Sequence, residues 1–168
     1  MTEPFAVWIT GLPASGKSTL AKALKGELSA RSVEAAILES DELRRVLTPK
    51  PRYDEEERDT FYGAMVHIGL LLLRHGVPVI FDATANRRRY RDRARGLIPR
   101  FYEVYVDTPL EVCRSRDPKG LYRAAPGSLP GLQAPYEPPL HPEFTSRDSV
   151  GRIADAITGG TSPAASCS

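Results

Sequence analysis

The sequence predicts an α/β fold in which a parallel sheet carries helices on both faces. Short apolar runs alternate with longer stretches of helical pattern, as in folds built from strand–helix–strand units. The runs are almost continuously apolar, which is typical of strands buried on both faces of a sheet. The four expected strands span residues 5–10, 35–38, 77–81 and 101–106.

Helical patterns follow these apolar runs. The stretch 19–30 contains few helix breakers, and the stretch 54–75 opens with four consecutive acidic residues. Acidic side chains favour a helix N-terminus because they interact with the positive end of the helix dipole, and Gly76 is a typical helix stop. Further helices are expected at 86–97, 109–116 and 146–157, the last from apolar residues at helical spacing.

Length and composition describe a single globular domain. The chain has 168 residues, of which 41% are apolar and 26% charged, and this size corresponds to about one domain. We expect the domain to span residues 1–157 and the small, polar segment 158–168 to be a disordered tail. The longest apolar stretch, 68–73, is far too short to cross a bilayer, so no membrane partner is expected.

Charge and cysteine content narrow the function classes. Lysine and arginine number 23 against 21 acidic residues, a balance that excludes a protein held on nucleic acid by bulk charge alone. Two cysteines make neither a disulfide framework nor a zinc site. A reducing, cytoplasmic location is therefore expected.

Proline is the unusual component of the composition. Eight of the 15 prolines lie between residues 109 and 142. Proline restricts the backbone and offers no N–H group to a helix or a central strand. The sequence therefore predicts a long irregular segment in this region.

A phosphate-binding loop (P-loop) follows the first expected strand. Residues 11–18 read GLPASGKS and match G-x-x-x-x-G-K-[ST] between a strand and a helix, the context that this motif requires. Successive backbone N–H groups of such a loop point at a phosphate chain. Lys17 would reach the β- and γ-phosphates of ATP, and Ser18 would ligate Mg²⁺. The competing interpretation, a coincidental glycine-rich turn, is disfavoured by the context.

Carboxylates follow two further strands. Asp41 lies just beyond 35–38, and Arg44 would share a helix face with it. Asp41 is a candidate base for a hydroxyl that attacks the γ-phosphate; the alternative is a helix N-cap beside a solvated arginine. Asp82 ends the run 77–81, where a carboxylate either helps to hold Mg²⁺ or caps the following turn.

The segment 86–100 is strongly basic, with seven arginines and one acidic residue. Such a cluster suits a nucleic-acid face, but Tyr90 is its one aromatic residue, and charge runs are more often solvated. We therefore favour a solvated helix face, with one or two arginines reaching the active site. The arginines are Arg87, Arg88, Arg89, Arg91, Arg93, Arg95 and Arg100.

Three longer motifs resemble those of the adenylyl-sulfate (APS) kinase family. Residues 106–113 (VDTPLEVC), 116–122 (RDPKGLY) and 135–139 (PYEPP) are similar to VDTPLEVC, RDPKGLY and SPYEPP of that family, in the same order. The likeness covers roughly residues 5–144. It implies a P-loop kinase that transfers the γ-phosphate of ATP to the 3′-hydroxyl of adenylyl sulfate, and it suggests a homodimer.

The resemblance also implies roles for individual residues. Asp41 and Arg44 match the family's D-x-x-R. Tyr53 and Arg58 match its F-S-x-x-D-R segment, in which the aromatic ring stacks on the acceptor adenine and the arginine contacts the acceptor. Lys119 matches a lysine of the family's lid, which would span about 116–142 here.

Together, these arguments predict a complete set of site residues. The expected catalytic residues are Lys17 and Asp41, and the expected Mg²⁺ ligands are Ser18 and Asp82. The acceptor is expected to contact Asp41, Arg44, Tyr53, Arg58, Asp82 and Lys119. ATP is expected to contact Gly11, Ala14, Ser15, Gly16, Lys17, Ser18, Thr19 and Arg116.

The acceptor side departs from the family pattern. A second acceptor-stacking phenylalanine of the family is Ala83 here, and losing one stacked aromatic costs about 1–3 kcal/mol of acceptor binding. The other departures are Ala85 in place of a phosphorylatable serine, Gly63 in place of an arginine, Thr48 in place of an asparagine, and Leu132 or Gln133 in place of an aromatic residue.

These departures keep other functions open beside adenylyl-sulfate kinase. One is a related kinase for a different nucleotide-linked or small hydroxyl acceptor, and residues 81–86 with the following arginines resemble polynucleotide-kinase-like enzymes. Another is a nucleotide-binding switch without an acceptor, which the Asp41 and Arg44 pair disfavours. The motifs at 116–122 and 135–139 favour a small nucleotide, so a nucleic-acid partner is not expected.

Overall fold

A parallel sheet forms the centre of the computed structural model, which describes residues 3–124 and 134–159. All its pairings are parallel, and β1 lies between β3 and β4 in the order β2-β3-β1-β4-β5. The carboxyl ends of the strands therefore meet at one edge. The strands are β1 (Ala6–Gly11), β2 (Ala36–Glu39), β3 (Val79–Asp82), β4 (Phe101–Val106) and β5 (Phe144–Thr145).

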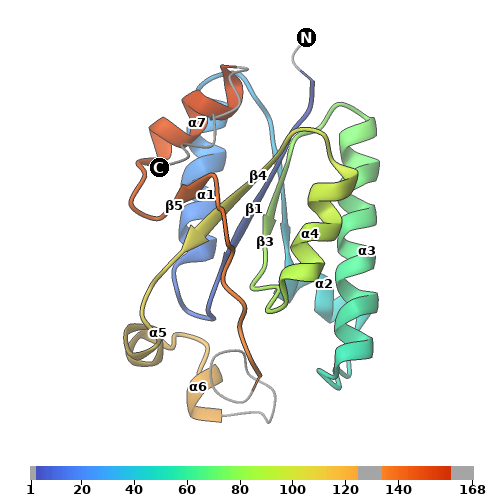
Figure 1. Ribbon diagram of the computed structural model, residues 1–168, viewed down its shortest axis with the longest axis vertical. Coiled ribbons are helices and arrows are strands. Elements are labelled where there is room, and N and C mark those ends of the chain that lie inside the picture. The colour runs from blue at the N-terminus through green and yellow to red at the C-terminus, as the bar shows by residue number, and fades with distance from the viewer. Residues whose placement is uncertain (1–2, 125–133, 160–168) are drawn as a thin grey trace.

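Helices cover both faces of this sheet (Figure 1). α1 (Lys17–Ser29) and α7 (Val150–Thr158) pack with Val7 and Ile9 of β1 in one core. α3 (Glu55–Arg74) and α4 (Arg88–Leu97) pack with Ala6 and Trp8 in the other. Side chains alternate between the faces of a strand, so consecutive residues of β1 enter two separate cores. The predicted fold class is confirmed.

Helix starts follow capping signals in the sequence. The Asp54 carboxylate accepts a hydrogen bond from the Glu57 N–H at 2.8 Å and so caps α3. Ser149 caps α7 in the same way, and the predicted start at residue 146 is therefore too early. The helix expected at 86–97 is α4, which begins two residues later than predicted. The helix expected at 109–116 is α5 (Leu110–Arg116), which begins one residue later than predicted.

Two further helices are short. α2 (Ser40–Leu47) follows β2 directly and carries Asp41 and Arg44, as their predicted shared helix face requires. α6 (Leu121–Ala124) lies in the proline-rich region, where the sequence predicted no helix. Both stand at the carboxyl edge of the sheet, together with α5 (Figure 1). α6 is one turn long and α2 about two, too short for a clear apolar period.

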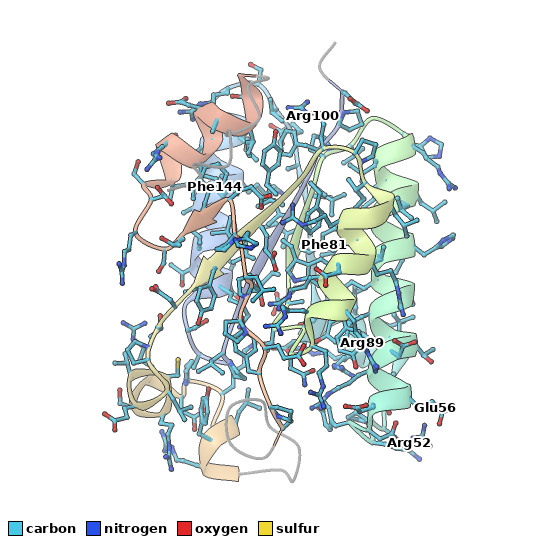
Figure 2. All side chains as sticks on the ribbon, in the orientation of Figure 1. Arg52, Glu56, Phe81, Arg89, Arg100 and Phe144 are labelled. Atoms are coloured by element: carbon cyan, nitrogen blue, oxygen red, sulfur yellow. The ribbon has the colours of Figure 1, made fainter. Side chains whose placement is uncertain are left out.

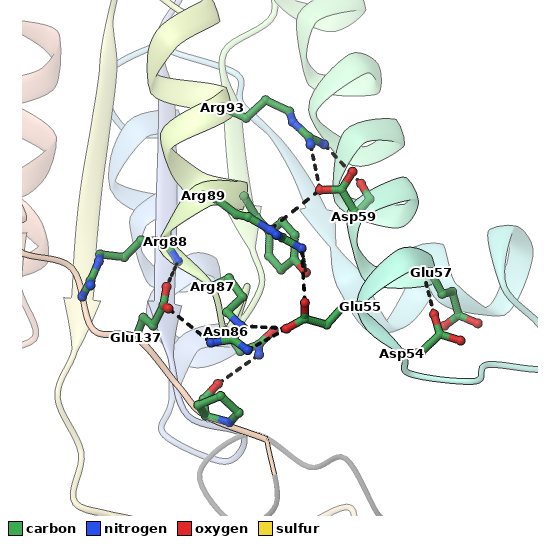
Figure 3. Close-up of polar contacts among 12 residues, drawn as sticks. Asp54, Glu55, Glu57, Asp59, Asn86, Arg87, Arg88, Arg89, Arg93 and Glu137 are labelled. Atoms are coloured by element: carbon green, nitrogen blue, oxygen red, sulfur yellow. Dashed lines mark hydrogen bonds and ion pairs between the residues drawn. The ribbon is translucent and has the colours of Figure 1, made fainter.

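The two faces of α4 have different partners. Arg93 forms an ion pair with Asp59 of α3 at 2.9 Å, and Arg87 pairs with Glu55 at 2.6 Å (Figure 3). Arg89 lies between α4 and α3 (Figure 2), with a side chain that is 55% exposed. The Arg91 side chain is 1% exposed. The prediction of a solvated face therefore holds for Arg89 and is wrong for Arg91.

An aromatic stack fills the core beneath α3. The indole of Trp8 stacks on the ring of Phe81 at 4.7 Å between centroids, and Phe81 lies in the interior between the sheet and α3 (Figure 2). Gly69 of α3 faces this ring, because a Cβ at position 69 would lie 2.3 Å from Phe81 Cζ. The close approach of helix and strand therefore needs a residue without a side chain.

We expect Gly69→Ala to lower the free energy of unfolding by about 1–3 kcal/mol, because the added methyl group overpacks the Phe81 ring. Urea denaturation measures this change. Gly96→Ala is the matched control: nothing lies within 4 Å of a Cβ on this exposed residue of α4, so the better helix propensity of alanine should leave stability equal or higher. Equal stability of both variants would contradict the close packing.

Candidate active site

The loop between β1 and α1 has the backbone of a phosphate-binding loop. Gly16 has a φ of 104°, in the left-handed region that favours glycine. A Cβ on Gly11 would lie 2.6 Å from the Val106 carbonyl oxygen, so the close approach of β4 requires a glycine at position 11. The Ser15 hydroxyl is buried and has no hydrogen-bond partner among the described residues.

Lys17 begins α1 and its ammonium lies inside the loop. Its Nζ donates a hydrogen bond to the Leu12 carbonyl oxygen at 2.9 Å. Burial lowers the pKa of Lys17 to about 8, and the negative charges of Asp82 and Asp41 partly oppose that shift. An anionic ligand would raise this pKa again, so the loop is built to take up negative charge.

Ser18 and Asp82 bring two hard oxygen donors together. The Ser18 hydroxyl donates to Asp82 Oδ2 at 2.6 Å, since parallel pairing of β1 with β3 places Asp82 opposite Ile9. Mg²⁺ prefers oxygen ligands and keeps several waters and phosphate oxygens beside one or two carboxylates. This donor pair fits Mg²⁺, and the contact with Ser18 accounts for Asp82 without a capping role.

Asp41 lies in the first turn of α2 and lines the same cavity as Lys17. Helix α2 begins at Ser40 after an N-cap at Glu39, so Asp41 is not the N-cap. Lys119 Nζ donates to Asp41 Oδ2 and lies 3.7 Å from Glu39 Oε1. The lysine therefore connects the segment after α5 to the start of α2.

Arg44 is held by three aromatic rings and one carboxylate. Its guanidinium carbon lies 4.0 Å from the ring centroid of Phe61 and 5.1 Å from that of Tyr53, within cation–π range. Glu57 accepts from Arg44 Nη1 at 3.3 Å and from the Tyr53 N–H at 3.2 Å. The Arg44 side chain is only 12% exposed, so the alternative of a solvated arginine is wrong.

A cavity of about 520 Å³ joins these groups. Twelve predicted site residues line it, whereas the predicted Gly11 and Ser15 do not. Sequence reasoning assigned no role to Glu39, Tyr62, Thr84, Asn86 and Asp117, which also line it. The twelve are Ala14, Gly16, Lys17, Ser18, Thr19, Asp41, Arg44, Tyr53, Arg58, Asp82, Arg116 and Lys119.

Simple signals mark some of the lining residues that sequence reasoning missed. Thr84 and Asn86 directly follow Asp82 at the carboxyl end of β3, where ligands bind in parallel sheets. Tyr62 lies four residues after Arg58 on α3 and so shares its helix face. Asp117 accepts hydrogen bonds from the Tyr122 and Arg123 N–H groups at 3.1 Å, a local contact with α6.

The positions that depart from the family pattern have local explanations. Ala83 and Ala85 are fully buried and belong to the core shared with α3 and α4. A Cβ on Gly63 would lie 2.9 Å from Arg93 Nη1, so a side chain from α4 takes the space. Thr48 ends α2, where its hydroxyl lies 3.4 Å from the Arg44 carbonyl oxygen. Leu132 and Gln133 lie outside the described residues.

The predicted lid is described in two parts, because residues 125–133 are outside the described ranges. In the first part, the Tyr122 hydroxyl donates to the Pro13 carbonyl oxygen of the phosphate-binding loop at 2.8 Å. Cys113, a free and buried thiol, packs with Tyr122 in a small core of its own. The tail predicted at 158–168 includes Thr158, the last residue of α7; residues 160–168 lie outside the described part.

Comparison with known proteins places the chain beside one family. Residues 3–147 match the family model for adenylylsulphate kinase. An adenylyl-sulfate kinase of Microcystis aeruginosa is 38% identical over 155 residues, covering 90% of this chain and 86% of that protein. A probable adenylyl-sulfate kinase of Pseudomonas aeruginosa is also 38% identical, covering 91% of this chain and 73% of its own length.

A solved structure gives the same similarity in three dimensions. The APS kinase CysC of Mycobacterium tuberculosis, solved in complex with AMPPNP and APS, matches with a TM-score of 0.82 at 30% sequence identity. The match covers 95% of this chain and 98% of that chain.

We expect the affinity for MgATP to fall as pH rises through about 8, the pKa of Lys17. The lysine is cationic below this pKa and neutral above it, and a phosphate chain binds the cation more strongly. Each pH unit above the pKa should weaken binding by up to about tenfold, as measured by titration calorimetry. Lys17→Met is the control and should bind weakly at every pH; a flat wild-type profile would contradict the lowered pKa.

Proposed function

The chain belongs to the adenylylsulphate kinase family, and we propose that its cavity transfers the γ-phosphate of ATP to the 3′-hydroxyl of adenylyl sulfate. One observation carries the assignment of residues. The phosphate-binding loop with Lys17 and the Asp41–Arg44 pair of α2 line the same cavity, so donor and acceptor groups share one space.

The donor side of the proposed site is the loop from Gly11 to Thr19. Its backbone N–H groups and the Lys17 ammonium neutralise the phosphate chain of ATP, while Arg116 contacts the nucleotide from the end of α5. Ser18 and Asp82 hold Mg²⁺ in this proposal. The ion, when bound, supplies positive charge that stabilises the charge developing on the phosphate oxygens.

The acceptor side centres on Asp41. Its carboxylate accepts the proton of the 3′-hydroxyl while the hydroxyl oxygen bonds to the γ-phosphorus. The bond from that phosphorus to the β–γ bridging oxygen breaks, and ADP leaves with the electron pair. Lys119 pairs with Asp41, and in this proposal it releases the carboxylate when the acceptor binds.

Acceptor recognition is assigned to the wall formed by α2 and α3. Tyr53 offers a ring for stacking on the adenine, and Arg44 and Arg58 offer positive charge for the sulfate–phosphate group. The cage of rings around Arg44 restricts its rotamers before the acceptor arrives. This reduces the entropy that the side chain loses on binding.

One observation favours a second candidate acceptor. Ala83 is fully buried and offers no ring where the family stacks a second one on adenine, and Tyr62 lines the cavity instead. A kinase for another nucleotide-linked hydroxyl compound is therefore the alternative. A nucleotide-binding switch is less consistent with the site, because Asp41 and Arg44 both face the cavity.

The surroundings of the enzyme are also part of the proposal. Among the described residues, no helix combines the length and apolar character needed to cross a membrane. We propose a cytoplasmic enzyme, since Cys113 is a free thiol of the kind that reducing compartments maintain. We also propose a homodimer, as the family resemblance suggests.

The acceptor is identified by incubating the protein with MgATP and a panel of compounds while ADP release is measured. The panel holds adenylyl sulfate, other nucleotides with sugar or amide groups, and oligonucleotides with a free 5′-hydroxyl. We expect the strongest acceleration with adenylyl sulfate and none in Lys17→Ala. Acceleration by another compound alone would replace the proposed acceptor, and activity in Lys17→Ala would overturn the donor site.

We expect Asp41→Asn to lower kcat by about 10²- to 10⁴-fold, the range for losing a general base. The affinity for MgATP should change little, because Lys17 and the loop remain. Glu42→Gln is the matched control: this neighbouring carboxylate of α2 is exposed and does not line the cavity. Equal kcat values for the two variants would show that Asp41 does not take the proton.

A further inference from the structure

The loop of residues 83–86 between β3 and α4 forms one wall of the cavity through Thr84 and Asn86. On the sheet side, the Ala83 N–H donates to the Ile9 carbonyl oxygen at 3.3 Å, and Trp8 Nε1 donates to the Ala83 carbonyl oxygen at 3.1 Å. This wall is therefore attached to β1, the strand that leads into the phosphate-binding loop.

Two further segments hold the same loop. The Ala85 N–H donates to the Tyr62 hydroxyl at 3.1 Å, from the side of α3. Asn86 Nδ2 donates to the Pro135 carbonyl oxygen at 3.0 Å, and the Glu137 N–H donates to the Asn86 carbonyl oxygen at 2.7 Å. Figure 3 shows Asn86 and Glu137 side by side at the start of α4.

The hydroxyl of Thr10 links these attachments, and its hydrogen bonds have one consistent arrangement. It donates to the Thr84 carbonyl oxygen at 2.7 Å, since a carbonyl can only accept. Having one hydrogen, it must then accept from Arg91 Nη1 at 2.9 Å and from the Tyr136 hydroxyl at 3.0 Å. Thr10 is fully buried, so water does not replace a lost partner at low cost.

Arg91 is anchored deep in the protein although it comes from an arginine-rich helix. Its Nε lies 3.2 Å from Glu103 Oε1 of β4, and Glu103 also pairs with Arg95 at 3.4 Å. Its Nη2 donates to the Glu137 carbonyl oxygen. A buried guanidinium is tolerated only when its charge is compensated; here Glu103 supplies the opposite charge, and the Nη1 and Nη2 hydrogen bonds fix where residues 136–137 lie.

We infer that Thr10, Tyr136 and Arg91 are positioning residues that hold the wall of Thr84 and Asn86 in the geometry needed by the acceptor. This inference rests on the proposed function, because the wall faces the same cavity as Asp41. It gives the arginine-rich helix and the PYEPP motif a common role, because Arg91 of the helix and Tyr136 of the motif both bind the Thr10 hydroxyl.

The protonation of Tyr136 is consistent with its role as the donor. Burial raises the pKa of Tyr136 to about 12, although hydrogen bonding to Thr10 and the charge of Arg91 act in the opposite direction. The hydroxyl therefore keeps its hydrogen at physiological pH. Tyr105 stacks on the same ring at 6.4 Å between centroids, but no hydrogen bond reaches its hydroxyl within the described ranges.

The experiment compares Tyr136→Phe with Tyr105→Phe, which removes a neighbouring hydroxyl. We expect Tyr136→Phe to raise KM for adenylyl sulfate by about three- to tenfold, as for the loss of one buried hydrogen bond, and to leave KM for ATP unchanged within about twofold. Tyr105→Phe should match the wild type in both constants. A wild-type KM for adenylyl sulfate in Tyr136→Phe would overturn the inference, as would equal increases in both KM values.

A second readout does not need turnover. Trp8 is the single tryptophan of the chain, and its indole N–H is bonded to the loop itself. Its emission spectrum should change in Tyr136→Phe and in Thr10→Val, and stay unchanged in Tyr105→Phe. Unchanged emission in both test variants would overturn the inference. A wild-type protein without adenylyl-sulfate turnover would instead overturn the proposed function, and the emission test would still decide on the loop.

Discussion

The parallel pairing of β1 with β3 and β4 is the constraint on which the rest of the structure depends. It places Gly11 opposite Val106 on one side and Ile9 opposite Asp82 on the other. The phosphate-binding loop therefore leaves the sheet between the ends of two neighbouring strands. A change of register by one residue would exchange the faces of β1 and separate Ser18 from Asp82.

The charges of the cavity follow from this placement. Two lysines, Lys17 and Lys119, line the cavity together with the carboxylates of Asp41, Asp82 and Glu39. Lys119 lies beside two of these carboxylates, Asp41 and Glu39. Groups of opposite charge therefore lie close together in this cavity. Under the proposed function, the phosphates of a nucleotide would compete with the carboxylates for both lysines, so binding of the donor would also change the environment of Asp41.

The arginine-rich helix illustrates how one composition serves different purposes. Arg93 faces α3 and pairs with Asp59, Arg89 is largely exposed, and Arg91 enters the core to meet Glu103. Sequence periodicity separates faces of a helix, but seven similar side chains give no apolar contrast from which to identify the buried one. Which arginine is buried depends on where β4 carries a carboxylate.

The sequence alone determined the sheet class, most helices and the position of the phosphate-binding loop, because apolar runs and the loop motif are local patterns of fixed spacing. It also indicated Asp41, Arg44 and Asp82, which stand at strand ends. The tertiary structure decided what those side chains touch: the aromatic cage of Arg44, the contact of Lys119 with Asp41, and the attachment of Thr84 through Thr10. These contacts join residues up to 78 positions apart, and only the packing of separate elements against one another brings such groups together.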